Sequence, residues 1–150
     1  MKLTIELVPK TCFYSNVRSE VTRTQWDIIR HQVASRAYNA CEICGDDSRI
    51  ECHEIWNYDD KKLIQKLVGM IALCKSCHMV KHMGYANVSG NGEKAIAHFI
   101  KINKLTRNVA YKYIEKVFDI WEQRSSKKWK LDISHLKEYG IDTGKIKNAK

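Results

Sequence analysis

The stretch "IALCKSCHMVKH", residues 71–82, decides how this chain folds. Two residues separate Cys74 from Cys77, a spacing that places two thiolates on one tight turn. A second pair with the same spacing, Cys41 and Cys44, lies 29 residues upstream. Two such pairs complete a tetrahedral Zn²⁺ site and leave no open position for water. We therefore predict a structural zinc; a redox pair beside an unrelated second pair, or four structural thiols, is the alternative reading.

Histidines surround the second cysteine pair in a metal-binding pattern. His78 and His82 are four residues apart, which puts both on the same face of a helix. The stretch "IECHEIW", residues 50–56, is typical of a strand and carries His53. Together these elements predict a small cleft for a second metal. We expect the other histidines to be structural or surface residues: His31, His98 and His135.

These motifs together resemble the HNH nucleases, the ββα-metal fold, in the version that carries a four-cysteine zinc. The resemblance covers about residues 41–84 and rests on CEIC (41–44), IECHEI (50–55), IALCKSCH (71–78) and His82. The flanking stretches "LTIELVP" and "ECHEIWNYDD" are similar to a bacterial and phage subgroup of these proteins.

The resemblance implies a fold and a set of roles. The fold would be α+β, with a zinc-bound, treble-clef-like ββα-metal core. His53 would be the general base that deprotonates water. His78 would bind a catalytic divalent ion, Mg²⁺, Mn²⁺, Ni²⁺ or Zn²⁺, and His82 would be a second ligand on the same helix.

Cys52 departs from the family pattern, which has an Asp or His ligand immediately before the base. Three readings stay open: a fifth ligand of the structural zinc, a buried thiol, or a ligand of the second metal beside His78 and His82. On a strand Glu54 shares a face with Cys52, so Glu54 could supply an oxygen ligand there. The same alternation puts Glu51 on the face of His53.

The asparagine that gives the family motif its middle letter is also missing. By position, Gly69 stands in its place, and Asn57 is the nearest asparagine.

Charge points to a polyanionic partner. The net charge of +9 comes entirely from residues 75–150, which hold sixteen Lys or Arg and seven Asp or Glu. Such an excess is the footprint expected for nucleic acid, although a solvated lysine-rich surface would look the same. Lys127, Lys128, Trp129 and Lys130 are candidate nucleic-acid contacts. Trp129 could stack on a base, but we favour a role in anchoring the C-terminal segment.

Periodicity predicts one domain over residues 1–150 with three parts. Residues 1–40 would hold a strand at 3–8 and a helix from about 24 to 39. The zinc core would occupy 41–84. A basic helical extension would occupy 93–150, with helices at about 93–103 and 107–124. No stretch approaches the roughly 20 apolar residues of a membrane span, and the start lacks a signal-peptide pattern, so a cytoplasmic location is expected.

The expected function is a metal-dependent HNH-type endonuclease that hydrolyses phosphodiester bonds of nucleic acid, DNA by preference. The alternative is a non-catalytic zinc-binding module of the same fold that binds nucleic acid or a protein. Other enzyme classes lack their motifs: the chain has no GxxxxGK[ST], GxGxxG or GxSxG, and the residues between His78 and His82 lack the glutamate of HExxH.

Overall fold

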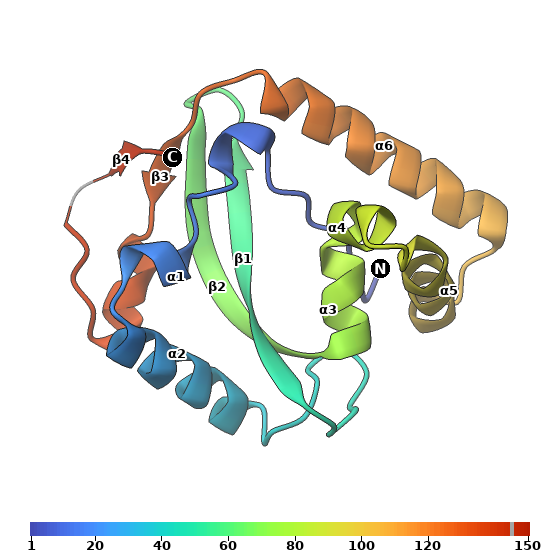
Figure 1. Cartoon of the computed structure of the whole chain (residues 1–150), viewed down its shortest axis with the longest axis horizontal. Helices are drawn as coiled ribbons and strands as arrows, with labels where there is room; N and C mark the ends of the chain where they lie inside the picture. Colours follow the sequence, from blue (N-terminus) through green and yellow to red (C-terminus); the bar gives the residue numbers. More distant parts are fainter. Residues whose placement is uncertain (145) are drawn as a thin grey trace.

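A computed structural model describes residues 1–144 and 146–150, and its helices and strands make an α+β fold (Figure 1). Its elements are η1 (Lys10–Cys12), α1 (Val17–Glu20), α2 (Arg23–Arg36), β1 (Ile50–Asp59), β2 (Ile64–Cys74), α3 (Lys75–Lys81), α4 (Met83–Val88), α5 (Gly92–Asn103), α6 (Arg107–Ser125), β3 (Lys130–Asp132), η2 (Ser134–Tyr139) and β4 (Lys147–Asn148).

The sheet has the order β1-β2-β3-β4, with β1 at one edge. β1 and β2 form a long antiparallel hairpin, β3 pairs parallel to β2, and β4 pairs antiparallel to β3. The hairpin turns because the Asp59 carboxylate accepts hydrogen bonds from the backbone N–H groups of Lys61 and Lys62, at 3.0 and 2.9 Å. Leu63 then adopts a left-handed conformation, with φ of 54°, just before β2 begins.

The hairpin separates two hydrophobic cores because its side chains alternate between faces. On β2, Met70 and Ala72 pack in one core with residues of α2, β3 and η2. Leu73 packs in the other core with residues of α3, α4 and α5, and Ile71 lies against it. Figure 1 shows the same division, with α2 on one side of the hairpin and α3 to α6 on the other.

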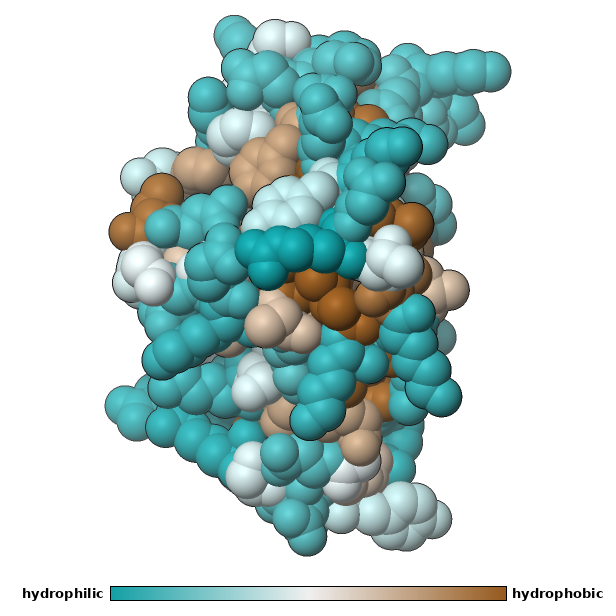
Figure 2. Space-filling model, turned by 90° about the vertical axis from the view of Figure 1, so that its right-hand side faces the viewer, coloured by the Kyte–Doolittle hydropathy of each residue, from teal (hydrophilic) through white to brown (hydrophobic). Residues whose placement is uncertain are grey.

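The helices predicted from periodicity are present. α5 and α6 match the expected ranges closely. α2 begins earlier than predicted because Thr22 is its N-cap: the Thr22 hydroxyl accepts from the Gln25 backbone N–H, and the Gln25 side chain accepts from the Thr22 N–H. The outer face formed around α5 is mostly hydrophilic, with a small hydrophobic patch at its centre (Figure 2). Across the described residues, no helix is long and apolar enough to span a bilayer.

Two predicted elements are wrong. Residues 3–8 are extended but form no strand, because their backbone is satisfied elsewhere: the Asn103 side chain accepts from Leu3 N–H, and the Lys81 carbonyl accepts from Glu6 N–H. The region 93–150 is α-helical only to Ser125, and the short 3-10 helix η2 is the one further helical turn among its described residues. After it, residues 130–132 join the sheet beside β2, where Leu131 is buried.

Candidate metal centres

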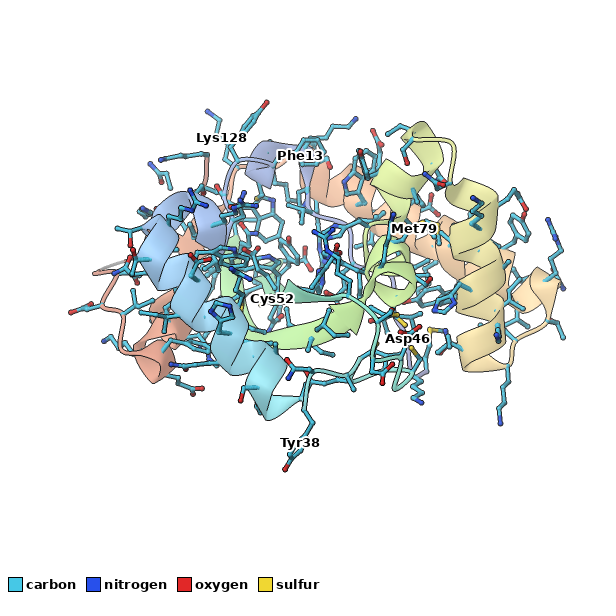
Figure 3. All side chains as sticks on the ribbon, turned by 60° about the horizontal axis from the view of Figure 1, so that its bottom comes forward. Phe13, Tyr38, Asp46, Cys52, Met79 and Lys128 are labelled. Carbon is cyan, nitrogen blue, oxygen red and sulfur yellow. The ribbon has the colours of Figure 1, made fainter. Side chains whose placement is uncertain are left out.

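Four cysteines converge where the residue 41–46 turn meets the end of β2 and the start of α3. The Sγ atoms of Cys41, Cys44, Cys74 and Cys77 all lie within 4.8 Å of one another. The turn is closed by a hydrogen bond from the Cys41 N–H to the Asp46 carbonyl, at 2.8 Å. Figure 3 shows sulfur atoms next to the labelled Asp46. The group can hold one structural metal ion such as zinc.

The charge state of the four thiols fits a cation. Although burial opposes ionisation, hydrogen bonds from backbone groups of Cys74 and Cys44 lower the pKa of Cys41 to about 7. Burial, together with the charge on Cys41, raises the pKa of Cys74 to about 11 and raises that of Cys77 further. The negative charge of one thiolate therefore disfavours ionisation of the neighbouring thiols. A bound cation offsets this repulsion between thiolates.

His98 lies beside this cluster, with its Nε2 3.2 Å from the Cys77 Sγ. An imidazole N–H at this distance can donate to a metal-bound thiolate and hold it in place. Sequence reasoning had expected a structural or surface role for His98.

Three histidines converge in a second group. His53 from β1, His78 from α3 and His82 after α3 each offer a nitrogen, and these atoms lie within 4.8 Å of one another. The Nε2 atoms of His78 and His82 are 3.1 Å apart. Two imidazole nitrogens bound to one ion at about 2.1 Å would lie roughly 2.9–3.4 Å apart, so this pair has the spacing of two metal ligands.

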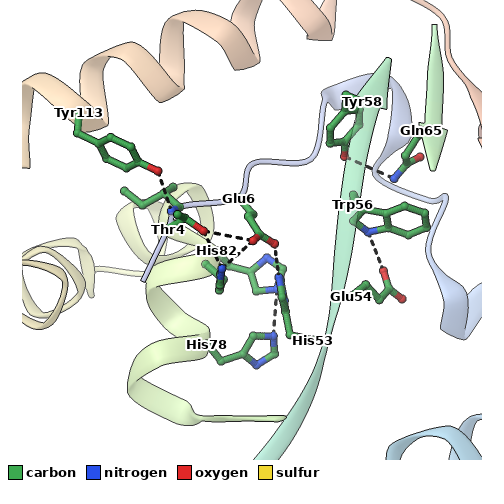
Figure 4. A network of polar contacts seen from close by, with 12 residues as sticks. Thr4, Glu6, His53, Glu54, Trp56, Tyr58, Gln65, His78, His82 and Tyr113 are labelled. Carbon is green, nitrogen blue, oxygen red and sulfur yellow. Dashed lines mark hydrogen bonds and ion pairs between the residues drawn. The ribbon is translucent and has the colours of Figure 1, made fainter. Parts of the chain in front are cut away.

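Carboxylates orient two of the three rings. The Glu6 Oε2 lies 2.8 Å from the His53 Nε2 (Figure 4). The Glu51 Oε2 lies 2.6 Å from the His78 Nδ1. With the Nε2–H of His53 donated to Glu6, its Nδ1 keeps a free lone pair. With the Nδ1–H of His78 donated to Glu51, its Nε2 is free for a metal.

Lys81 fixes Glu6 in turn. This lysine is 5% exposed, and its Nζ donates to the Glu6 Oε1 at 2.6 Å and to the Thr4 hydroxyl at 2.9 Å. Although burial works in the opposite direction, the bond to His53 and the charge of Lys81 lower the pKa of Glu6. Glu6 is therefore a carboxylate at neutral pH, able to accept from both neighbours.

Two of the imidazoles, those of His53 and His82, are neutral at physiological pH. Burial lowers the pKa of His53, against the opposing effect of Glu6. Burial, and then the nearby charge of protonated His53 and His78, lower the pKa of His82 to about 3. Neutral imidazole is the form that binds metals and accepts protons.

Cys52 and Glu54 do not join this group, because β1 turns them to its other face. Cys52 pairs with Ala72 and Glu54 with Met70, both in the α2-side core, whereas His53 pairs with Ile71 on the α3 side. Directly paired residues share a face of the sheet. Cys52, labelled in Figure 3, packs against the α2-side core, and burial followed by the Glu54 charge raises its pKa to about 12.

Glu54 is held by protein donors instead. Its carboxylate accepts from the Val17 N–H at 2.7 Å and from the Trp56 Nε1–H at 3.1 Å. Burial raises its pKa to about 7. The structure thus brings His78 and His82 together next to His53. It places the other two predicted ligands of the second metal, Cys52 and Glu54, on the opposite face of β1.

The two positions considered for an asparagine lie beyond His53 along the hairpin, one on each strand. Gly69 is inside β2, opposite Ile55 where the hairpin register shifts, and Asn57 is exposed on β1 opposite Lys66.

Trp129 is an internal anchor. It is 3% exposed, its Nε1–H donates to the Arg124 carbonyl at 3.0 Å, and its ring packs edge-on against Tyr58. The ring is therefore not available to stack on a base. Lys128 and Lys130 are exposed beside it, and Lys127 is half-buried.

A cleft of about 450 Å³ opens along β1 and reaches all three histidines. One wall carries Asn16, Arg18 and Trp26, and the other is formed by residues 5–8 and by α6 residues that include Trp121 and Arg124. The site is thus accessible to a ligand of moderate size.

Sequence reasoning missed the contributions of Glu6 and Lys81 and the contact of His98 with Cys77. Strand alternation put Glu51 on the face of His53 but did not identify its contact with His78. Glu6 is 47 residues from His53 in the chain, and no spacing rule connects them.

Comparisons with protein-family models, with curated proteins and with solved structures gave no match for this chain.

Proposed function

We propose that this protein is a metal-dependent endonuclease of the HNH type that hydrolyses phosphodiester bonds, with DNA as the preferred substrate. The observation that carries the proposal is the convergence of His53, His78 and His82 in an open cleft, with carboxylates on two of their rings. The four-cysteine cluster beside it would hold a structural zinc.

His53 is the residue suited to act as general base. Its ring is neutral and 5% exposed, and Glu6 fixes its tautomer so that Nδ1 can accept a proton from water. Protonation of His53 would be stabilised by the adjacent Glu6 carboxylate, as in other oriented acid–base pairs.

His78 and His82 are the residues suited to hold a divalent ion through their Nε2 atoms, and Glu51 orients the first of them. When bound, such an ion supplies positive charge to the scissile phosphate and the leaving oxygen. Two neutral nitrogen ligands favour Zn²⁺, Ni²⁺ or Mn²⁺ over Mg²⁺ at this position.

The cationic surface supports a nucleic-acid substrate. The net charge of +9 attracts a polyanion, and Arg18 and Arg124 line the same cleft as the histidines. Phosphate contacts of this kind position a backbone without reading its sequence.

The test is cleavage of plasmid and of circular single-stranded DNA with Mg²⁺, Mn²⁺, Ni²⁺ or Zn²⁺. His53→Ala should abolish cleavage while zinc content and circular dichroism stay unchanged. His31→Ala, an exposed histidine on α2, is the matched control and should cleave normally. Absence of cleavage with every ion, or normal cleavage by His53→Ala, would refute the proposal.

One observation favours a second candidate, a non-catalytic module of the same fold. The position of the family's asparagine is Gly69 within a strand, so that residue's contribution is missing there. This candidate predicts salt-dependent DNA binding with no cleavage under any of the metal conditions above.

A further inference from the structure

Indole rings line both walls of the cleft beside the histidines. Trp26 of α2 and Trp56 of β1 lie on one side, and Trp121 of α6 lies on the other. Each of the three is partly exposed, and Trp26 and Trp56 also pack against the α2-side core. Each ring therefore keeps an open part that a ligand in the cleft can contact.

Two of these rings are held in fixed orientations by their own N–H groups. The Trp56 Nε1–H donates to the Glu54 carboxylate at 3.1 Å, and the Trp121 Nε1–H donates to the Val8 carbonyl at 2.9 Å. The Lys10 ammonium lies 4.8 Å from the Trp121 ring centroid. A ring whose polar edge is already satisfied offers its aromatic surface to a ligand.

The position of Trp56 relates these rings to the chemistry. It lies three residues beyond His53 on β1, roughly 10 Å along the strand. Figure 4 shows Trp56 and His53 projecting from β1 in different directions, with Glu54 next to the indole. Trp56 pairs with Leu67 and packs against the α2-side core, so it lies on the opposite face of β1 from His53. β1 is an edge strand, and the cleft reaches side chains of both its faces. A strand of nucleic acid that crosses this edge with a phosphate at His53 would bring a neighbouring nucleotide to the indole.

Charge in the cleft fits a backbone that passes between the walls. Arg18 is exposed at the rim on α1. Arg124 lies on the opposite wall, stacked 4.9 Å above the Tyr58 ring and paired with the exposed Asp60. Aromatic platforms combined with cations along a groove are the arrangement by which proteins hold unpaired strands.

We propose that the cleft binds an unpaired segment of a DNA strand, with bases stacked on Trp56 and Trp26, its backbone on Arg18, and the scissile phosphate at His53. Bases in a duplex are already stacked on one another, so an intact duplex cannot use these rings without being opened. The inference rests on the proposed nuclease function and names its substrate class: single strands, flaps, or locally melted sites.

The test measures binding separately from cleavage. The His53→Ala protein, loaded with zinc, is titrated with a mixed-sequence 12-nucleotide DNA strand carrying one 2-aminopurine, and with the same sequence as a duplex. We expect tighter binding of the single strand and quenching of the 2-aminopurine as it stacks. Adding Trp56→Leu should weaken single-strand binding roughly 5- to 150-fold. Tyr85→Leu, a residue 73% exposed on α4, is the matched control and should change nothing.

The outcomes separate this inference from the function on which it rests. Equal binding of strand and duplex, with no quenching, would overturn the inference even if plasmid is cleaved. Trp56-dependent binding of the single strand without cleavage by the unsubstituted protein would support the cleft assignment and refute the nuclease. If Trp56→Leu does not fold, the quenching signal and Arg18→Gln decide, because Arg18 is exposed and its loss should weaken single-strand binding.

Discussion

The Glu6–Lys81 pair gives the sharpest test of how the histidine group is held. Lys81 is 5% exposed and Glu6 is its carboxylate partner at 2.6 Å. Glu6→Gln keeps the size of the side chain, but it replaces one of the two accepting oxygens by an NH2 donor and leaves the lysine charge buried without a counter-charge. Lys81→Met removes the positive charge of the pair and keeps the length of the side chain.

The expected cost follows from burial. Removing one partner of a fully buried ion pair costs about 3–5 kcal/mol, because the remaining charge is left uncompensated. The Glu6 side chain is 28% exposed, so water offsets part of the loss, and we expect about 2–3 kcal/mol for Glu6→Gln. The double variant removes both charges and should cost less than Glu6→Gln alone, about 1 kcal/mol.

The assay is urea unfolding followed by circular dichroism at a fixed zinc concentration, for the unsubstituted chain, both single variants and the double variant. The interaction free energy from this double-mutant cycle is the quantity of interest. Single-variant costs that simply add in the double variant, or a cost of Glu6→Gln within error of zero, would refute the argument that this pair supports the site.

Three further predictions follow from the structure. The free energy of unfolding should fall as the pH drops below 4.5, the ordinary pKa of glutamate. The pKa of Glu6 is lowered in the folded protein, so its contribution to stability is complete only above the pKa of the unfolded chain. Glu6→Gln should flatten the acidic part of a plot of unfolding free energy against pH. Removing zinc with a strong chelator, or Cys44→Ser, should abolish the circular dichroism of the folded chain, and an unchanged spectrum would contradict the structural role. Trp129→Ala should lower the free energy of unfolding in urea by about 3–5 kcal/mol, because the ring is buried. Lys128→Gln should leave this free energy unchanged and should lower the salt dependence of DNA binding.

Local patterns in the sequence predict the parts of this fold that local interactions determine. The cysteine spacing predicts a four-thiol cluster, and the structure has these thiols together. The periodicity of residues 93–103 and 107–124 predicts α5 and α6, and alternation along β1 places Glu51 with His53 and Cys52 with Glu54. These features need only the geometry of one helix, one strand or one turn.

The parts that could not be predicted depend on contacts between distant segments. Nothing in residues 3–8 indicates that Glu6 meets His53, because the meeting depends on how the N-terminal segment packs over α3. The parallel pairing of β3 with β2 joins Lys130 to Ile64 across four intervening helices, α3 to α6, and has no local signal. The side of the hairpin on which Cys52 lies also depends on the register of the hairpin, which turns it toward the α2-side core.

The two clusters share one short helix, and this has a thermodynamic consequence. Cys77 and His78 are consecutive in α3, so their Cα atoms are about 3.8 Å apart and cannot be positioned independently. An ion that fixes Cys77 restricts the motion of His78 and should raise the metal affinity of the histidine group. Thermodynamic linkage then requires that an ion on His78 raise the metal affinity of the cysteine cluster by the same factor. Metal titrations of the two sites should therefore show positive cooperativity, with the order of filling set by the tighter, all-thiolate site.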